Sequence, residues 1–378
     1  MRKRWLLTFM DPVFYDIKTI TKETDAMDPK GGILDMVSRH RTQVMGFAAM
    51  WIFIFHVRNE VTVFAGLPVI GDIDIFFVNI GFNGVDIFLF LSGWGLYHAI
   101  NKHSLTTFYK RRYRRLILPF VAACVAAAAF GGWGILRLVK AVTGWTFLTE
   151  NVNEPKWFVP AIAIFYLLFP FYHKLFEKAK NKYIFTAVVL VLWTALTSVL
   201  PLVTSRSDIY GVIGRIPVFV IGILTGWYTF NGRKIKGPWV WIVFAVMLAA
   251  GFQMEYYVAF KKITLINEAL TCAVPGLLIG IPMCFIAGCA FGLLDKVKFI
   301  QKAYGFVGMI SLEFYVVQET IYGAVKTPVY YSGVPFNSHL LALIVFVLSL
   351  GSGYLIYLIT FVISKKMDGE NVFVDARK

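Results

Sequence analysis

Long hydrophobic runs alternate with short polar segments along almost the whole chain. A helix needs about 20 apolar residues to span a bilayer, and ten runs reach roughly that length. They cover residues 43–63, 76–98, 116–136, 157–176, 183–203, 211–229, 238–258, 269–291, 304–325 and 339–364. The runs lack the period-two alternation of a membrane β-barrel, and lipid offers no hydrogen-bond partner to other backbone conformations. The pattern therefore predicts an all-α protein, a polytopic transmembrane helical bundle of about ten spans.

Composition and charge give this bundle an orientation. Of the 378 residues, 58% are hydrophobic and 16% are charged. Ten spans put both termini on one side, whose loops hold 27 Lys and Arg residues against eight in the opposite loops. Cytosolic loops are enriched in these residues, so both termini are expected in the cytosol. The net charge of +15 then fits loops beside an anionic leaflet, and nucleic-acid binding is not expected.

The same pattern predicts one transmembrane domain, residues 43–364. A cytosolic or interfacial segment, residues 1–42, precedes it, and a cytosolic tail, residues 365–378, follows it. The first segment begins with basic residues, but Asp11 and Pro12 interrupt its apolar run too early for a signal peptide.

Small residues inside the spans predict packing rather than chemistry. The pairs Gly222/Gly226 and Gly288/Gly292 have the small-xxx-small spacing of closely packed membrane helices. The four cysteines all fall inside predicted spans without CxxC spacing. Neither a disulfide framework nor a metal site is expected from them.

Polar side chains within the spans are the candidates for function, because a charge at membrane depth is rarely kept without a partner or a task. They are His56, Asn83, Asp86, His98, Arg215, Glu255, Glu313, Gln318 and Glu319. One interpretation is a relay of charged groups in a proton-coupled transporter or flippase without acyl transfer.

A second interpretation is an enzyme in which His56 acts as a general base. Asp86 lies about 15 Å into the second span at about 1.5 Å per residue, a depth close to that of His56. A carboxylate at this depth could fix the imidazole tautomer and stabilise its cation. Asn83 shares one helical stripe with Asp86, whereas Ser92 points elsewhere. His56 could instead be a histidine at the outer membrane interface.

Six segments together resemble the acyltransferase-3 family of integral membrane acyltransferases. The family has a first-span histidine, then a G-V-D segment, then an Arg-rich loop ending before a proline. The matching segments are "HVRNE" (56–60), "GFNGVDIFLFLSGWGLY" (81–97), "FYKRRYRRLILPF" (108–120), "WFVPAIAIFYLLFP" (157–170), "GRIPVFVIGILTG" (214–226) and "GMISLEFYVVQETI" (308–321).

The resemblance implies transfer of an acyl group, usually acetyl, from acetyl-CoA or another acyl-CoA in the cytosol. The acceptor would be a hydroxyl of an extracytoplasmic glycan or glycolipid, and the protein would be a multi-pass protein of the plasma membrane. By this resemblance His56 is the catalytic histidine, Asp86 and Ser92 belong to the second-span motif, and Arg215 matches the sixth-span arginine. The sequence carries no signature of an oligomeric state.

The donor-binding residues implied by the resemblance lie in the basic loop. Arg112 and Arg115 match the family's loop arginines and would hold the phosphates of coenzyme A. Met45 stands where the family has a basic residue eleven positions before the histidine, and Arg41 could replace it. The alternative for the loop is a lipid anchor.

The remaining candidates support the motif or the acceptor. Glu313 and Gln318 belong to the ninth-span motif, and Gln318 replaces a second histidine that is common in the family. Trp157 and Trp145 face outward and could stack on a sugar or anchor the chain at the interface. The mechanism expected is direct attack assisted by His56, with an acyl-histidine intermediate as the alternative.

Overall fold

The computed structural model describes residues 32–62, 67, 69–150, 157–202, 208–261, 268–331 and 337–367. Most of the N-terminal segment and the last eleven residues of the predicted cytosolic tail lie outside these ranges. Within the described ranges the secondary structure is helical, and no strand occurs there. This agrees with the all-α bundle predicted from the sequence.

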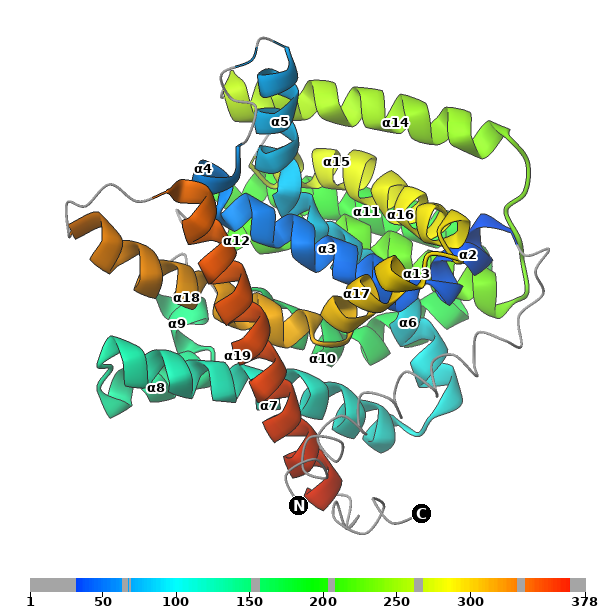
Figure 1. Cartoon of the computed structure of the whole chain (residues 1–378). Helices are drawn as coiled ribbons and strands as arrows, with labels where there is room; N and C mark the ends of the chain where they lie inside the picture. The colour runs from blue at the N-terminus through cyan, green and yellow to red at the C-terminus, as the bar shows by residue number, and fades with distance from the viewer. Residues whose placement is uncertain are drawn as a thin grey trace.

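The helices follow one another with short connections (Figure 1). In chain order they are α2 (Ile33–Arg39), α3 (Arg41–His56), α4 (Arg58–Val61), α5 (Ile70–Asn79), α6 (Gly84–Lys102), α7 (Leu105–Gly131), α8 (Ile135–Val142), α9 (Trp145–Thr149), α10 (Phe158–Lys178), α11 (Lys182–Val199), α12 (Asp208–Ile213), α13 (Ile216–Phe230), α14 (Trp239–Glu255), α15 (Glu268–Pro275), α16 (Ile281–Leu293), α17 (Lys298–Met309), α18 (Ser311–Tyr331) and α19 (Ser338–Met367). Short 3₁₀ turns occur at Ile80–Asn83 and Leu200–Leu202, and π-helical turns at Tyr256–Phe260 and Gly276–Gly280.

Eight helical segments of the described chain are long and apolar enough to cross a membrane. They are Ile70–Lys102, Leu105–Gly131, Phe158–Lys178, Lys182–Val199, Ile209–Phe230, Trp239–Val258, Ala269–Leu293 and Ser338–Met367. Eight of the ten predicted spans are therefore represented, and the first and the ninth differ.

These two spans differ for separate reasons. The first, predicted over residues 43–63, ends early because α3 stops at His56 and Val57 separates it from the short α4. Helix α3 has 16 residues, or about 24 Å at about 1.5 Å per residue. The ninth is divided at Ile310 into α17 and α18, and α18 carries Glu313, Glu319 and Lys326. These charges lower its hydropathy.

The centre of the bundle is held together by close approaches of helix backbones. A Cβ atom at Gly222 of α13 would overlap the backbone oxygen of Phe90 in α6, and one at Gly226 would lie 2.7 Å from the backbone oxygen of Trp94. A Cβ atom at Gly288 would lie 2.9 Å from the backbone Cα atom of Val37. These contacts confirm the close packing predicted from the glycine pairs.

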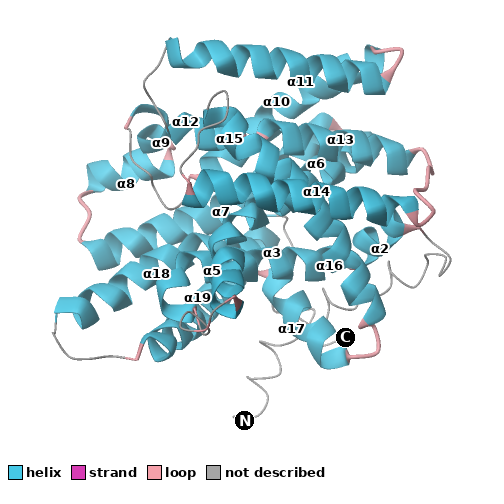
Figure 2. Cartoon of the chain, turned by 90° about the horizontal axis from the view of Figure 1, so that it is seen from above, coloured by secondary structure: helices cyan, strands magenta, loops and turns pink. Residues whose placement is uncertain are grey.

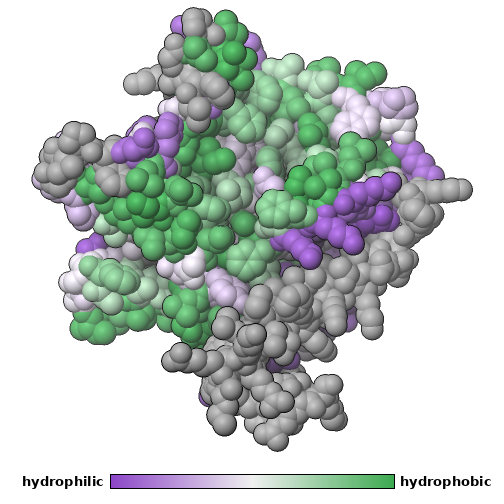
Figure 3. Space-filling model, viewed as in Figure 1, coloured by the Kyte–Doolittle hydropathy of each residue, from purple (hydrophilic) through white to green (hydrophobic). Residues whose placement is uncertain are grey.

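The arrangement of the helices separates a packed centre from an apolar periphery. The space-filling view shows mainly hydrophobic side chains on the visible face, with hydrophilic ones gathered towards two opposite ends (Figure 3). Helix α11 lies along one edge (Figure 2) and exposes Val191 and Leu192. Such a surface suits a bundle surrounded by lipid.

Candidate active site

His56 is the last residue of α3, and its imidazole faces a carboxylate of α18. Its Nε2 atom lies 3.2 Å from Oε1 of Glu319, and the side chains are 15% and 28% exposed. Its Nδ1 atom is buried and has no hydrogen-bond partner within the described residues. A neutral imidazole that donates from Nε2 to Glu319 keeps a lone pair on Nδ1. This geometry suits a general base acting through Nδ1.

Asp86 lies in the first turn of α6 and forms an ion pair with Arg215, the residue that precedes α13. Both side chains are buried. The carboxylate that contacts His56 is therefore Glu319, and not Asp86 as the sequence led us to expect. Helix α6 turns Asp86 towards Arg215 at the start of α13 and towards the π-helical turn at Gly276.

Two aromatic rings connect the Asp86–Arg215 ion pair with the residue next to His56. The guanidinium carbon of Arg215 lies 5.5 Å from the Phe82 ring centroid. Phe82 in turn contacts Phe55, the neighbour of His56, with 5.6 Å between ring centroids. The ion pair thus links α6 to the start of α13. Contacts through Phe82 and Phe55 lead from this pair to His56.

One face of α18 carries the polar groups that approach the end of α3. Tyr315, Glu319, Tyr322 and Lys326 follow a spacing of four, three and four residues, so they form one stripe. The Tyr315 and His56 ring centroids are 6.4 Å apart. Tyr322 donates a hydrogen bond of 2.8 Å to Glu60, whose other oxygen lies 2.9 Å from Nζ of Lys326.

The stripe shows what the sequence interpretation missed. Glu319 had been noted there as a polar residue of the ninth span, without a role at His56. The spacing of the stripe, together with a carboxylate at its centre, is the signal that could have identified it.

A cavity of about 410 Å³ lies near the beginning of α3. Its walls come from α3, α7, α17 and α19, and Arg111, Arg114 and Arg115 of α7 contribute its cations. Arg115 donates to both oxygens of the fully buried Glu313, at 2.6 and 3.4 Å, and to the backbone oxygen of Met309 at 2.8 Å. Its guanidinium is thereby fixed at the cavity wall.

The predicted donor-binding arginines are divided between this cavity and α6. Arg115 lines the cavity, whereas Arg41 donates to the backbone oxygen of Leu91 at 2.6 Å and Arg112 to that of Gly95 at 3.4 Å. Met45, which replaces the family's basic residue, lines the cavity itself. Arg41 therefore contacts α6 and is not among the residues that line the cavity.

Helix α3 connects the cavity with His56. Thr42 and Met45 line the cavity, and Ala49 and His56 follow at spacings of four and seven residues on the same face. Met45 and His56 are about 17 Å apart along the axis, at about 1.5 Å per residue. The cationic cavity and the histidine therefore lie at opposite ends of one helix face.

The other predicted residues have varied surroundings. Asn83 is buried and donates to the backbone oxygen of Ile80 at 2.8 Å, so its amide nitrogen is already engaged. Ser92 is half-buried in α6. Gln318 is 1% exposed, and neither end of its amide has a partner within the described residues.

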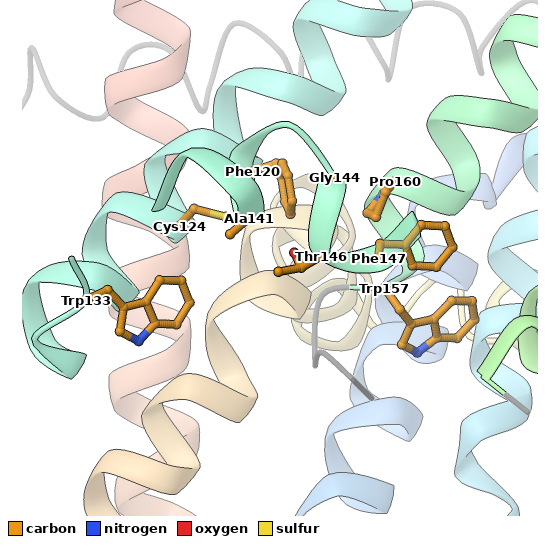
Figure 4. A pocket seen from close by; sticks show the side chains of 9 residues that line it. All are labelled: Phe120, Cys124, Trp133, Ala141, Gly144, Thr146, Phe147, Trp157 and Pro160. Atoms are coloured by element: carbon orange, nitrogen blue, oxygen red, sulfur yellow. The ribbon is translucent and has the colours of Figure 1, made fainter. Parts of the chain in front are cut away.

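Trp157 lines a small aromatic pocket between α7, α9 and α10. Figure 4 shows Trp157 beside Phe147, with Trp133 on the other side of the pocket. Trp157 also packs on Phe158, whose ring centroid lies 5.5 Å from that of Tyr315, the neighbour of His56. Trp145 is 54% exposed.

In the part of the chain that the structure describes, no group of three or more His, Cys, Asp or Glu side chains could hold a metal ion.

Comparison with known proteins identifies the family. The model of the acyltransferase-3 family, described as an acyltransferase domain, matches residues 45–358. Acyltransferase MdmB from Streptomyces mycarofaciens is 29% identical over 154 residues, which make up 36% of this chain and 39% of that protein. The match thus spans well under half of this relative's length. No solved structure matches the chain. Because the family model covers most of the sequence, from the cavity-lining Met45 to beyond the Glu319 that faces His56, the chain belongs to the acyltransferase-3 family of membrane acyltransferases.

Proposed function

We propose that the protein moves an acyl group, acetyl in the first instance, from acyl-CoA in the cytosol to a hydroxyl of an extracytoplasmic glycan or glycolipid. The observation that carries the proposal is the placement of an arginine-lined cavity and the His56–Glu319 pair at opposite ends of one face of α3. Membership of an acyltransferase family favours this chemistry over a transporter without acyl transfer.

The donor is assigned to the cavity because of its charge. Coenzyme A carries anionic phosphates, which charge-assisted hydrogen bonds from arginine hold well. Arg111, Arg114 and Arg115 line one wall of the cavity from α7, and they belong to the basic segment that the charge distribution predicts on the cytosolic side. The pantetheine arm would then run along α3 towards His56.

The reaction needs two proton transfers, one from the acceptor hydroxyl to His56 and one from His56 to the departing thiolate. Nδ1 of His56 removes the proton of the acceptor hydroxyl while its oxygen attacks the thioester carbonyl. The carbon–sulfur bond then breaks, and the imidazolium returns the proton to the departing thiolate. Glu319 stabilises the imidazolium between these steps, because its carboxylate lies 3.2 Å from Nε2.

The experiment is an assay of the protein in lipid nanodiscs with acetyl-CoA and a glycan or glycolipid extract. Free coenzyme A thiol and acetylated product, the latter detected by mass spectrometry, should form together. His56→Ala should abolish both, whereas His339→Ala, a change of the same kind at an exposed position, should not. Acetylation by His56→Ala at the wild-type rate would overturn the proposal.

The same preparation distinguishes direct attack from an acyl-histidine intermediate. Incubation with acetyl-CoA alone, followed by rapid acid quenching and peptide mass spectrometry, should show no acetylated His56. An acetyl group on this residue would instead identify it as the nucleophile.

A further inference from the structure

The cavity of about 410 Å³ has two chemically different walls. Helix α7 supplies the arginines described above, and α19 supplies Tyr357, Thr360, Phe361 and Ser364. The four α19 residues have spacings of three, one and three positions, so they share one face of the helix. One wall is therefore cationic, and the other is aromatic with hydroxyl groups.

The aromatic residues of this wall are ordered. The rings of Tyr357 and Phe361 are 6.2 Å apart between centroids, with 26° between their planes. Arg115 lies 5.8 Å from the Tyr357 centroid, and Nζ of Lys365 lies 6.0 Å from that of Phe361. Arg114 donates to the backbone oxygen of Ser364 at 3.3 Å. Cations thus adjoin the aromatic surface along its length.

This surface is not the lipid-facing side of α19. Leu355, Ile359 and Ile363 are exposed and occupy the opposite face of the helix. Aliphatic residues therefore lie on the outer side, while the rings face the cavity. An aromatic belt at the membrane interface would not require this separation.

A flat aromatic surface beside arginines suits one part of the proposed donor. A purine ring stacks on aromatic side chains, and adjacent arginines hold the phosphates of the same nucleotide. The cavity is of a size that small ligands occupy. The pantetheine arm has no aromatic group, so it gives no reason for such a wall.

We propose that Phe361 and Tyr357 form an adenine subsite, so that the protein selects the nucleotide of coenzyme A and not only its pantetheine thioester. This inference rests on the proposed function, in which acyl-CoA is the donor. Phe361 is the main stacking residue, because it is half-buried and lines the cavity, whereas Tyr357 is only 5% exposed. A donor thioester without the nucleotide would react poorly.

The binding test uses adenosine 3′,5′-bisphosphate, the nucleotide end of coenzyme A, titrated onto the purified full-length protein. Phe361→Leu removes the aromatic face and keeps an apolar side chain. The affinity of this variant for the bisphosphate should fall about tenfold, which is the scale of stacking one base on an aromatic residue. Phe361→Tyr should bind as the wild type does. Phe171→Leu, at a residue 68% exposed on α10, is the matched control and should also bind normally.

The kinetic test compares acetyl-CoA with S-acetylpantetheine, which has the same thioester. The wild type should use acetyl-CoA at least tenfold better by kcat/KM, and Phe361→Leu should reduce this preference. Equal bisphosphate affinities of wild type and Phe361→Leu, or equal use of both donors by the wild type, would overturn the adenine subsite alone. Failure of the wild type to bind or consume acetyl-CoA would overturn the proposed function as well.

Discussion

Replacing Glu319 by Gln tests the contact that most distinguishes the structure from the sequence interpretation. The amide keeps the size of the side chain and an oxygen that can accept from Nε2 of His56, but it removes the negative charge. If Glu319 stabilises the imidazolium that forms during acyl transfer, the loss should appear in kcat, with little change in the KM for acyl-CoA.

The size of this effect follows from the distance between the groups. Two unit charges at 3.2 Å attract each other by about 1.3 kcal/mol in bulk water and by about 5 kcal/mol at an effective dielectric constant near 20. Both side chains are mostly but not completely buried, so an intermediate value is expected. Since about 1.4 kcal/mol corresponds to a tenfold change in rate, kcat should fall between about tenfold and a thousandfold.

The assay is steady-state release of coenzyme A thiol at saturating acceptor, with thermal stability measured in parallel. Glu150→Gln is a matched control, because Glu150 also forms an ion pair, with Lys140 at 2.7 Å, away from His56. It should leave kcat unchanged. If Glu319→Gln turned over like the wild type while His56→Ala was inactive, Glu319 would have no part in orienting or stabilising the base.

Three further predictions concern the base atom, the donor cavity and the helix packing. Nδ1-methylhistidine at position 56 should be inactive although the ring is retained, because the methyl group blocks the base atom; turnover by this variant would assign the reaction to Nε2. Arg115→Ala should weaken coenzyme A binding about tenfold or more, and Arg115→Lys should rescue only part of it, because the bidentate contact is lost; equal affinities in calorimetric titration would contradict this. Gly222→Ala should lower the melting temperature, because its Cβ would overlap Phe90, while Gly323→Ala, with open space around it, should not; equal melting temperatures would refute the packing argument.

The spans were predictable because each segment that crosses lipid must be a helix of about 20 mainly apolar residues. Hydropathy alone located the helix that contains Asp86 and the segment Ile209–Phe230 that contains Arg215. Glycine spacing predicted close packing at Gly222 and Gly226, and the structure shows that the partner helix is α6. Both features can be read within a single segment, from its hydropathy or from the spacing of its small residues.

The partners of the charged residues were less predictable, because they depend on how helices are rotated. The residue count predicted a depth for Asp86 but could not predict the direction of its side chain, and the rotation of α6 pairs it with Arg215. In the same way the basic loop was recognised, while α7 turns Arg115 into the cavity and Arg112 towards α6. A single sequence contains no direct record of these rotations.

The first and ninth predicted spans, which depart most from ideal membrane helices, form α3, α17 and α18 and supply His56 and Glu319. Helix α17 packs on the first half of α3, where Thr42 and Gly46 contact the backbone around Gly308. The break at Ile310 then lets the chain change direction, so that α18 reaches the other end of α3 with Glu319. An unbroken apolar helix could not follow α3 in this way and also present a carboxylate to its last residue. The low hydropathy of α18 is therefore a consequence of its charged residues, which include Glu319 at His56 as well as Glu313 and Lys326 in ion pairs with Arg115 and Glu60.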